Sequence, residues 1–250
     1  HLGLTNSNLN FIDVESLISK KKIDVVFLCT KSSQSIEYAE IFLKKKITVI
    51  DLSGAFRFDS SKNYFKAYGS EHSKKKLLES SAYGATEFND KVIKKNSLIA
   101  NPGCYALCAL FSLAPLTKSK FADFGKIIKI HAINGITGAG MSLRQEITHK
   151  NVMENMLAYN GSGHRHAPEI EEKLESFFSI RNASIDLNTA HGNFRRGIFM
   201  QISVETKKSY NKKITRKSLI KEFKNFYKSN KFNNFIFIND FEKTGDKNFK

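Results

Sequence analysis

The pattern of apolar and polar positions divides the chain into two parts of different character. In the first part, short apolar runs predict buried strands, and a segment with helical spacing at 35–45 joins the first two of them. These strands are expected at 23–29, 47–52 and 97–100. A strand, a helix and a strand with short links form a right-handed parallel unit. The polar stretch at 62–90 is expected to be rich in loops.

In the second part, apolar and polar residues alternate over longer stretches. This pattern favours longer strands with helices beside them. Strands are expected at 126–133, 199–204 and 235–238, and helices at 105–116, 142–158, 168–178 and 216–228. The fold class is therefore α/β: part of a doubly wound, Rossmann-like parallel sheet, followed by an α+β domain with a mixed sheet. The boundary is expected close to Cys104, which separates residues 1–103 from residues 104–250.

Composition is that of a globular protein, with 41% hydrophobic and 26% charged residues among 250. The longest apolar run, at 106–116, is too short for a bilayer-spanning helix, so no membrane association is expected. Three cysteines do not suggest a disulfide framework, and a reducing, cytoplasmic compartment is expected. The chain begins His-Leu-Gly-Leu, without Met or a secretory pattern, and is therefore interpreted as a fragment or a trimmed chain.

The formal net charge of +16 raises the question of a polyanionic partner. Lysines, however, are spread along the whole chain, and no zinc finger, helix-turn-helix or aromatic-interleaved RNA motif accompanies them. A solvated lysine surface is therefore favoured over a nucleic-acid patch. The less frequent arginines are more informative, because a planar two-pronged donor suits carboxylate or phosphate.

The sharpest chemical feature is Asn101-Pro102-Gly103-Cys104, where a strand ends in a tight turn before an apolar helix. A thiol at a helix N-terminus meets free N–H groups and the positive end of the helix dipole, which favour the thiolate. The same donors suit an oxyanion formed by attack on a carbonyl. Cys104 is therefore the candidate nucleophile, whereas Cys29 and Cys108 are interpreted as small buried apolar residues.

A second feature is the string Gly163-His164-Arg165-His166-Ala167-Pro168-Glu169. Because Pro168 suits a first helical turn, the two histidines are expected on the loop that enters a helix. No spacing in the sequence supplies a convincing third metal ligand, so no metal is expected. Proton relay by a histidine to and from the thiol is the more economical interpretation, with Glu169 orienting that histidine or raising its pKa.

Two further turns are candidate binding elements. Thr137-Gly138-Ala139-Gly140 follows a strand, and its glycines permit close approach of a ligand. Arg196 precedes the strand at 199–204 and is a candidate clamp for an anionic group, with a surface turn as the equal alternative.

Taken together, these motifs resemble the N-acetyl-gamma-glutamyl-phosphate reductase family of arginine biosynthesis. The matching strings occur in the family's order: Asp51-Leu52-Ser53-Gly54-Ala55-Phe56-Arg57, Tyr83-Gly84, Asn101-Pro102-Gly103-Cys104-Tyr105, Gly138-Ala139-Gly140, His164-Arg165-His166-x-Pro168-Glu169 and Arg196-Gly197-Ile198. They favour this family over its relative, aspartate-semialdehyde dehydrogenase, which is kept as an alternative.

The resemblance implies a role for each matching residue. Cys104 matches the nucleophile and His166 the acid/base histidine, with His164 and Glu169 around them. The substrate site is implied for Arg57, Tyr159 and Arg196, and the cofactor site for Thr137, Gly138, Ala139 and Gly140. Residues 1–103 would then be a partial dinucleotide-binding domain, and residues 104–250 the catalytic, substrate-binding and dimerisation domain of a homo-oligomer.

The implied reaction is NADPH-dependent conversion of an acyl phosphate, N-acetyl-glutamyl 5-phosphate, to the semialdehyde through a Cys104 thioester. The family's opening strand with its glycine-rich phosphate turn, and its C-terminal Asp-Asn-Leu-x-Lys-Gly segment, have no counterpart in this sequence. Thr137 stands where the family has Ser, and Met141 where Arg is common. Two other functions stay open: a Cys104–His166 hydrolase that needs no nucleotide, and a basic protein that binds RNA or a membrane surface.

Overall fold

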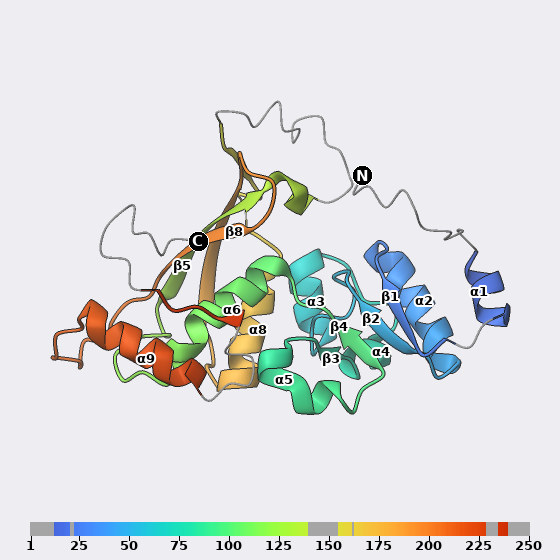
Figure 1. Ribbon diagram of the computed structural model, residues 1–250, viewed down its shortest axis with the longest axis horizontal. Helices are drawn as coiled ribbons and strands as arrows, with labels where there is room; N and C mark the ends of the chain where they lie inside the picture. The colour runs from blue at the N-terminus through green and yellow to red at the C-terminus, as the bar shows by residue number, and fades with distance from the viewer. Residues whose placement is uncertain (1–12, 21–22, 140–154, 162, 229–234, 240–250) are drawn as a thin grey trace.

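The computed structural model describes residues 13–20, 23–139, 155–161, 163–228 and 235–239, which form two sheets with helices around them (Figure 1). The first sheet has the strand order β1-β2-β4-β3, and every pairing is parallel. Its strands are β1 (Val25–Leu28), β2 (Thr48–Asp51), β3 (Ala82–Tyr83) and β4 (Leu98–Ala100). The expected parallel sheet is confirmed.

Short helices connect these strands, beginning with α2, whose buried side recurs at helical spacing. The helices of this part are α1 (Val14–Lys20), α2 (Ser32–Lys44), α3 (Ser61–Tyr68), α4 (Lys75–Glu79) and α5 (Thr86–Ile93). The stretch at 62–90 is thus largely helical, and the expectation of a loop-rich segment was wrong. The Ser60 side chain accepts the Asn63 N–H at the start of α3, and Gly69, at φ 68°, ends it.

The second sheet has the order β6-β7-β5-β8 and mixes parallel and antiparallel pairs, which confirms the expected mixed sheet. Its strands are β5 (Ile127–Gly135), β6 (Leu157–Tyr159), β7 (Ser184–Gly192) and β8 (Ile198–Ser203). On β5 and β7, buried residues alternate with exposed ones, so one face packs inward and the other is open to solvent.

The inward face is covered by α6 (Cys104–Thr117) and α8 (His166–Phe178), which lie beside each other (Figure 1). The 3-10 helix η1 (Ile136–Ala139) follows β5, and α9 (Arg216–Lys228) packs on α6. Two expectations were wrong here. Leu157 and Ala158 belong to a strand instead of the expected helix, most of which lies outside the described residues, and 235–238 form no strand.

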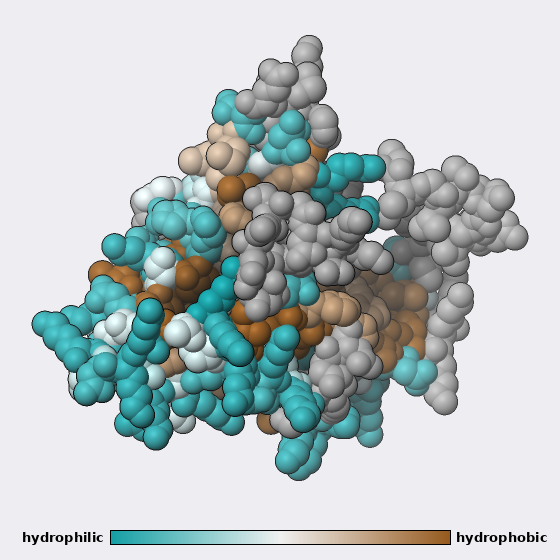
Figure 2. Space-filling view, turned by 60° about the vertical axis from the view of Figure 1, so that its left-hand side comes forward, coloured by the Kyte–Doolittle hydropathy of each residue, from teal (hydrophilic) through white to brown (hydrophobic). Residues whose placement is uncertain are grey.

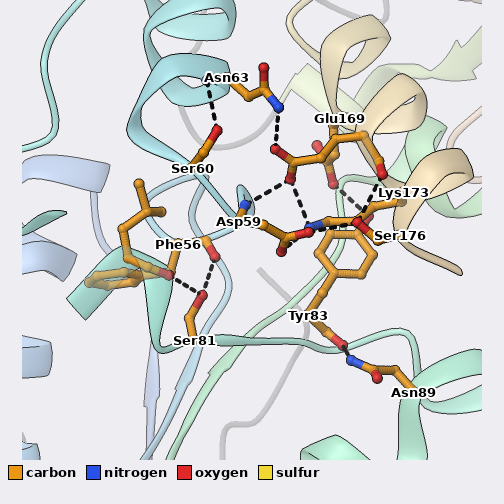
Figure 3. Close-up of polar contacts among 12 residues, drawn as sticks. Phe56, Asp59, Ser60, Asn63, Ser81, Tyr83, Asn89, Glu169, Lys173 and Ser176 are labelled. Atoms are coloured by element: carbon orange, nitrogen blue, oxygen red, sulfur yellow. Dashed lines mark hydrogen bonds and ion pairs between the residues drawn. The ribbon is translucent and has the colours of Figure 1, made fainter. Parts of the chain in front are cut away.

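A buried lysine joins the two parts of the molecule (Figure 3). Lys173 of α8 is 1% exposed, and its Nζ donates to Asp59 Oδ1 at 2.5 Å and to Glu172 Oε1 at 2.9 Å. Glu172 in turn accepts the Asp59 N–H at 2.7 Å and the Asn63 side-chain amide at 2.6 Å. Helix α8, which begins at the second histidine of the His-x-His motif, is thereby tied to the segment that follows β2.

The surface is mostly hydrophilic, with apolar areas between polar side chains on the face that Figure 2 shows. Several lysines pair with nearby carboxylates, including Lys44 and Lys74 with Glu40 and Lys75 with Glu71. Within the described ranges, no helix has both the length and the apolar character that crossing a bilayer requires.

Candidate active site

Cys104 is the first residue of α6, directly after the turn that ends β4. Gly103, at φ −64° and ψ 140°, is the N-cap, and its carbonyl accepts the Leu107 N–H at 2.9 Å. The thiol therefore faces the unpaired N–H groups of a helix N-terminus, as the sequence predicts. Cys104 is exposed, whereas Cys108 is half-buried; Cys29 is also exposed, so the expectation that it is buried was wrong.

The environment of Cys104 does not favour the thiolate as strongly as its helix position suggests. Desolvation by the surrounding protein raises the pKa of the Cys104 thiol, although Cys104 as a residue is exposed and lines a pocket. The N–H of Tyr105 and the charge of Arg57 act in the opposite direction and lower this pKa. The expected net stabilisation of the thiolate was therefore wrong for the free protein, because burial outweighs the helix N–H groups.

Both histidines of the motif are buried, and His166 lies on α8 itself instead of the expected preceding loop. The His166 N–H donates to His164 Nδ1 at 3.1 Å, which leaves the His164 proton on Nε2. Burial and the Arg165 charge lower the pKa of His164 to about 4. Burial, His164 and nearby arginines hold the pKa of His166 well below its usual value. Both imidazoles are therefore neutral near neutral pH.

Glu169 is completely buried, but it makes no hydrogen bond to His166, the histidine that the sequence suggested it orients. Its Oε1 accepts two hydrogen bonds, from the Tyr83 hydroxyl at 2.7 Å and from the Gly103 N–H at 2.8 Å. The pKa of His166 is lowered by burial, His164 and arginines, and Glu169 is not among the causes of this shift, so the alternative in which Glu169 raises that pKa is not supported. Glu169 instead binds the turn that carries the candidate nucleophile.

Arg57 lies behind the histidine instead of on the pocket wall. Its side chain is 9% exposed, and Nη1 is 3.4 Å from His166 Nε2 and 3.8 Å from Glu169 Oε2. The remaining guanidinium nitrogens donate to backbone carbonyls. The structure therefore does not bring Arg57 into the substrate pocket that the family resemblance implies for it, because its donors are directed to neighbouring protein groups.

A pocket of about 330 Å³ opens in front of Cys104 and both histidines. Its polar wall was largely missed by the sequence analysis, although Tyr159 was expected to lie there. The Tyr105 hydroxyl donates to Asn134 Oδ1 at 2.6 Å and lies 2.6 Å from the Tyr159 hydroxyl. His191 stacks on the Tyr159 ring at 4.3 Å. Tyr105 follows the candidate nucleophile directly, and His191 is the second-to-last residue of the alternating strand β7; both signals were present in the sequence.

The glycine-containing turn after β5 reaches the same pocket. Gly138 and Ala139 line it, whereas the Thr137 hydroxyl donates to the Arg195 carbonyl at 2.6 Å. Gly140 lies outside the described residues, as does Met141. The small residues Gly138 and Ala139 leave space for a cofactor at this wall of the pocket. Contact between this turn and a cofactor stays a prediction.

Arg196 is exposed and is not among the residues that line the pocket. Its turn is fixed against the start of η1, because the Ile136 N–H donates to the Phe194 carbonyl at 2.9 Å. Substrate binding by Arg196 stays a prediction. Across the described part of the chain, no cluster of three or more His, Cys, Asp or Glu side chains is arranged to hold a metal ion.

Comparison with known families matches nearly the whole chain. The model of the semialdehyde dehydrogenase NAD-binding domain matches residues 4–96, and the model of the semialdehyde dehydrogenase dimerisation domain matches residues 104–246. Curated relatives include N-acetyl-gamma-glutamyl-phosphate reductases of Campylobacter jejuni, 36% identical over 91% of this chain, and of Clostridium novyi, 39% identical over 83%. The resemblance found in the motifs is confirmed.

The chain covers 65% of the Campylobacter protein and 59% of the Clostridium protein. Among solved structures, aspartate semialdehyde dehydrogenase of Francisella tularensis matches 86% of this chain and 65% of its own, with a TM-score of 0.58 and 11% identity. Aspartate semialdehyde dehydrogenase II of Vibrio cholerae matches 79% of this chain and 59% of its own, with a TM-score of 0.55 and 14% identity. These structures share the fold. On the family models and relatives together, the chain belongs to the semialdehyde dehydrogenase family.

Proposed function

We propose that the protein reduces N-acetyl-glutamyl 5-phosphate to the 5-semialdehyde with NADPH, through a thioester on Cys104. The observation that carries this proposal is the position of the Cys104 thiol, at the N-terminus of α6 and in one pocket with His164 and His166. The names of the curated relatives supply the substrate class.

The chemistry begins when the Cys104 sulfur attacks the carbonyl carbon of the acyl phosphate. The thiol proton passes to a neutral histidine, the bond from carbon to the phosphate oxygen breaks, and phosphate leaves. NADPH, when bound, supplies the hydride that reduces the thioester. The carbon–sulfur bond then breaks, which frees the aldehyde, and the Cys104 sulfur takes back the proton that the histidine accepted.

The histidine assigned to proton transfer is His166, because it begins α8 and lines the pocket beside Cys104. Its lowered pKa keeps it neutral, and a neutral imidazole is the form that accepts the thiol proton. Main-chain N–H groups at the start of α6 are placed to stabilise the oxyanion that each carbonyl addition creates. His164 and Tyr159 are assigned to substrate contact, as residues on the pocket wall.

The cofactor assignment rests on the pocket rim and on the family. Gly138 and Ala139 present backbone and at most a methyl group to the pocket that contains Cys104, which leaves room for a flat ring. We assign the nicotinamide to this rim, with Thr137 and Gly140 as further contacts. The substrate is a small anionic molecule, and Arg196 is the proposed clamp for one of its carboxylates.

A homo-oligomer is proposed to form through the solvent-facing side of the second sheet. That side carries Ile127 and Phe199, which are 54% and 56% exposed, in a region that matches a dimerisation-domain model. Phe199→Lys should shift the protein toward the monomer in sedimentation velocity; an unchanged association state would exclude this face. The three free thiols agree with a reducing compartment, and we propose the cytoplasm.

The activity is tested in reverse, by mixing the protein with the semialdehyde, NADP⁺ and phosphate and recording reduced nicotinamide. Reduction of NADP⁺ that depends on phosphate and is lost in Cys104→Ser supports the proposed reductase activity. A Cys104–His166 hydrolase would instead consume the acyl phosphate without nucleotide. Absence of nicotinamide reduction together with such hydrolysis would contradict the proposal.

A further inference from the structure

A buried group of charged and polar side chains lies directly behind the turn that carries Cys104. Four chain segments meet there: the residue after β2, the end of β3, the turn after β4, and the first turn of α8. The ends of parallel strands converge at one edge of a sheet, which explains why residues far apart in sequence meet at this point.

Glu169 connects three of these segments. Its Oε1 accepts the Tyr83 hydroxyl from β3 and the Gly103 N–H from the turn before α6, while Glu169 itself belongs to α8. Hydrogen bonds to an ionised carboxylate are shorter and stronger than neutral ones. Gly103, the residue before Cys104, is therefore held by the Glu169 carboxylate, which does not line the pocket.

Arg57 connects the remaining segment. Its Nη2 donates to the Leu52 carbonyl at 3.2 Å, directly after β2, and its Nε donates to the Asn101 carbonyl at 2.9 Å, three residues before Cys104. The third nitrogen, Nη1, approaches both His166 and Glu169. A planar fork meets these directions at once, which an ammonium group cannot do.

The backbone at Gly103 lies close to both His166 and Glu169. A Cβ at this position would lie 2.6 Å from His166 Nε2 and 2.8 Å from Glu169 Oε2, closer than the 3.0 Å below which real Cβ atoms are essentially never found. The backbone of the turn thus lies in direct contact with the imidazole and the carboxylate. A shift of either side chain toward Gly103 would therefore displace the turn that precedes α6.

We propose that Arg57, Tyr83 and Glu169 are positioning residues, a clamp that fixes the Cys104 turn and the His166 imidazole relative to each other. They act on the nucleophile through Gly103 and Asn101, and none of the three lines the pocket in front of Cys104. The clamp deepens the reductase proposal, but its test needs only the thiol and not turnover, so the two can fail separately.

The test measures the alkylation rate of Cys104 by iodoacetamide across a pH series, with peptide mapping to separate the three cysteines. Glu169→Gln keeps an acceptor for the Gly103 N–H but removes a negative charge near the thiol. The Cys104 midpoint should move to lower pH, because Glu169 raises the pKa of Cys104. Labelling at neutral pH should become up to about threefold faster, because the charge of Glu169 contributes less to this pKa than burial and the N–H of Tyr105 do.

The matched control is Glu172→Gln on the same helix, since Glu172 is also buried and binds Asp59 and Asn63, away from the turn.

A second pair of variants removes a hydroxyl. Tyr83→Phe should slow Cys104 labelling, because it removes the hydrogen-bond donor that partly offsets the charge of Glu169. Tyr64→Phe changes a buried tyrosine outside the clamp and should leave the rate unchanged. Melting temperatures are recorded for all four variants. Shifts confined to Glu169→Gln and Tyr83→Phe support the clamp. Any other pattern, including equal shifts in the controls or no shift, overturns it.

Discussion

Replacing Lys173 by Met removes the central cation of the network that joins α8 to the segment after β2. The Nζ is within hydrogen-bond distance of two carboxylates, Asp59 and Glu172, and lies 4.7 Å from the centre of the Tyr83 ring. Methionine keeps most of the aliphatic stem, so the change isolates the charge. The side chains of Lys173 and Glu172 are 1% and 7% exposed, whereas Asp59 is 52% exposed.

The magnitude follows from what is left unpaired. Removing one partner of a buried ion pair costs about 3–5 kcal/mol, because the other charge stays desolvated. Asp59 regains water, and Glu172 keeps its bonds from the Asp59 N–H and the Asn63 amide, so the lower end applies. We expect the free energy of unfolding to fall by about 3 kcal/mol.

The assay is urea unfolding followed by far-ultraviolet circular dichroism, with the slope compared among variants. The double variant Lys173→Met/Glu172→Gln should recover part of the loss, since it removes the stranded charge as well as the cation. A loss in Lys173→Met below about 0.5 kcal/mol, the range of an ordinary surface substitution, would refute the reasoning.

Three further predictions concern the pocket. His166→Asn should lower kcat by roughly 10²–10⁴ with little change in melting temperature, as expected for a proton-transfer group; near-normal kcat would remove that role. His164 has a folded pKa of about 4, below the unfolded value of 6.5, so stability present above pH 6.5 should be lost as pH falls towards 4. His164→Gln should remove up to about 3 kcal/mol of that decline, measured by urea unfolding at both limits. Tyr159→Phe should raise KM more than it lowers kcat, because its hydroxyl belongs to the pocket wall with Tyr105; an unchanged KM would exclude that contact.

Sequence patterns predicted the elements that carry the reacting groups better than those around them. The turn at Cys104 and the helix after it were predictable, because Pro, Gly and an apolar run are strong local signals. The alternation in β7 was equally readable but was overlooked, and with it the pocket residue His191. The short helices α3 and α4 were missed because their stability comes from packing of Phe58, Tyr64 and Leu78 more than from propensity.

The roles of Arg57 and Glu169 could not be derived from their motifs. Each motif is informative about which residue types occur, but the direction of each side chain depends on contacts between segments more than 40 residues apart, such as Arg57 with Asn101. The shift in the Cys104 pKa shows the same limit. The helix N-terminus is a local feature, whereas the burial that outweighs it comes from the whole tertiary structure.

The central claim, that Cys104 carries the acyl group, is tested most directly by intact-protein mass spectrometry. The protein is mixed with N-acetyl-glutamyl phosphate generated in the same tube, without NADPH, and quenched in acid. We expect an added mass equal to the N-acetyl-glutamyl group, mapped to the Cys104 peptide and absent in Cys104→Ser. An unmodified Cys104, or the same added mass in Cys104→Ser, would contradict it.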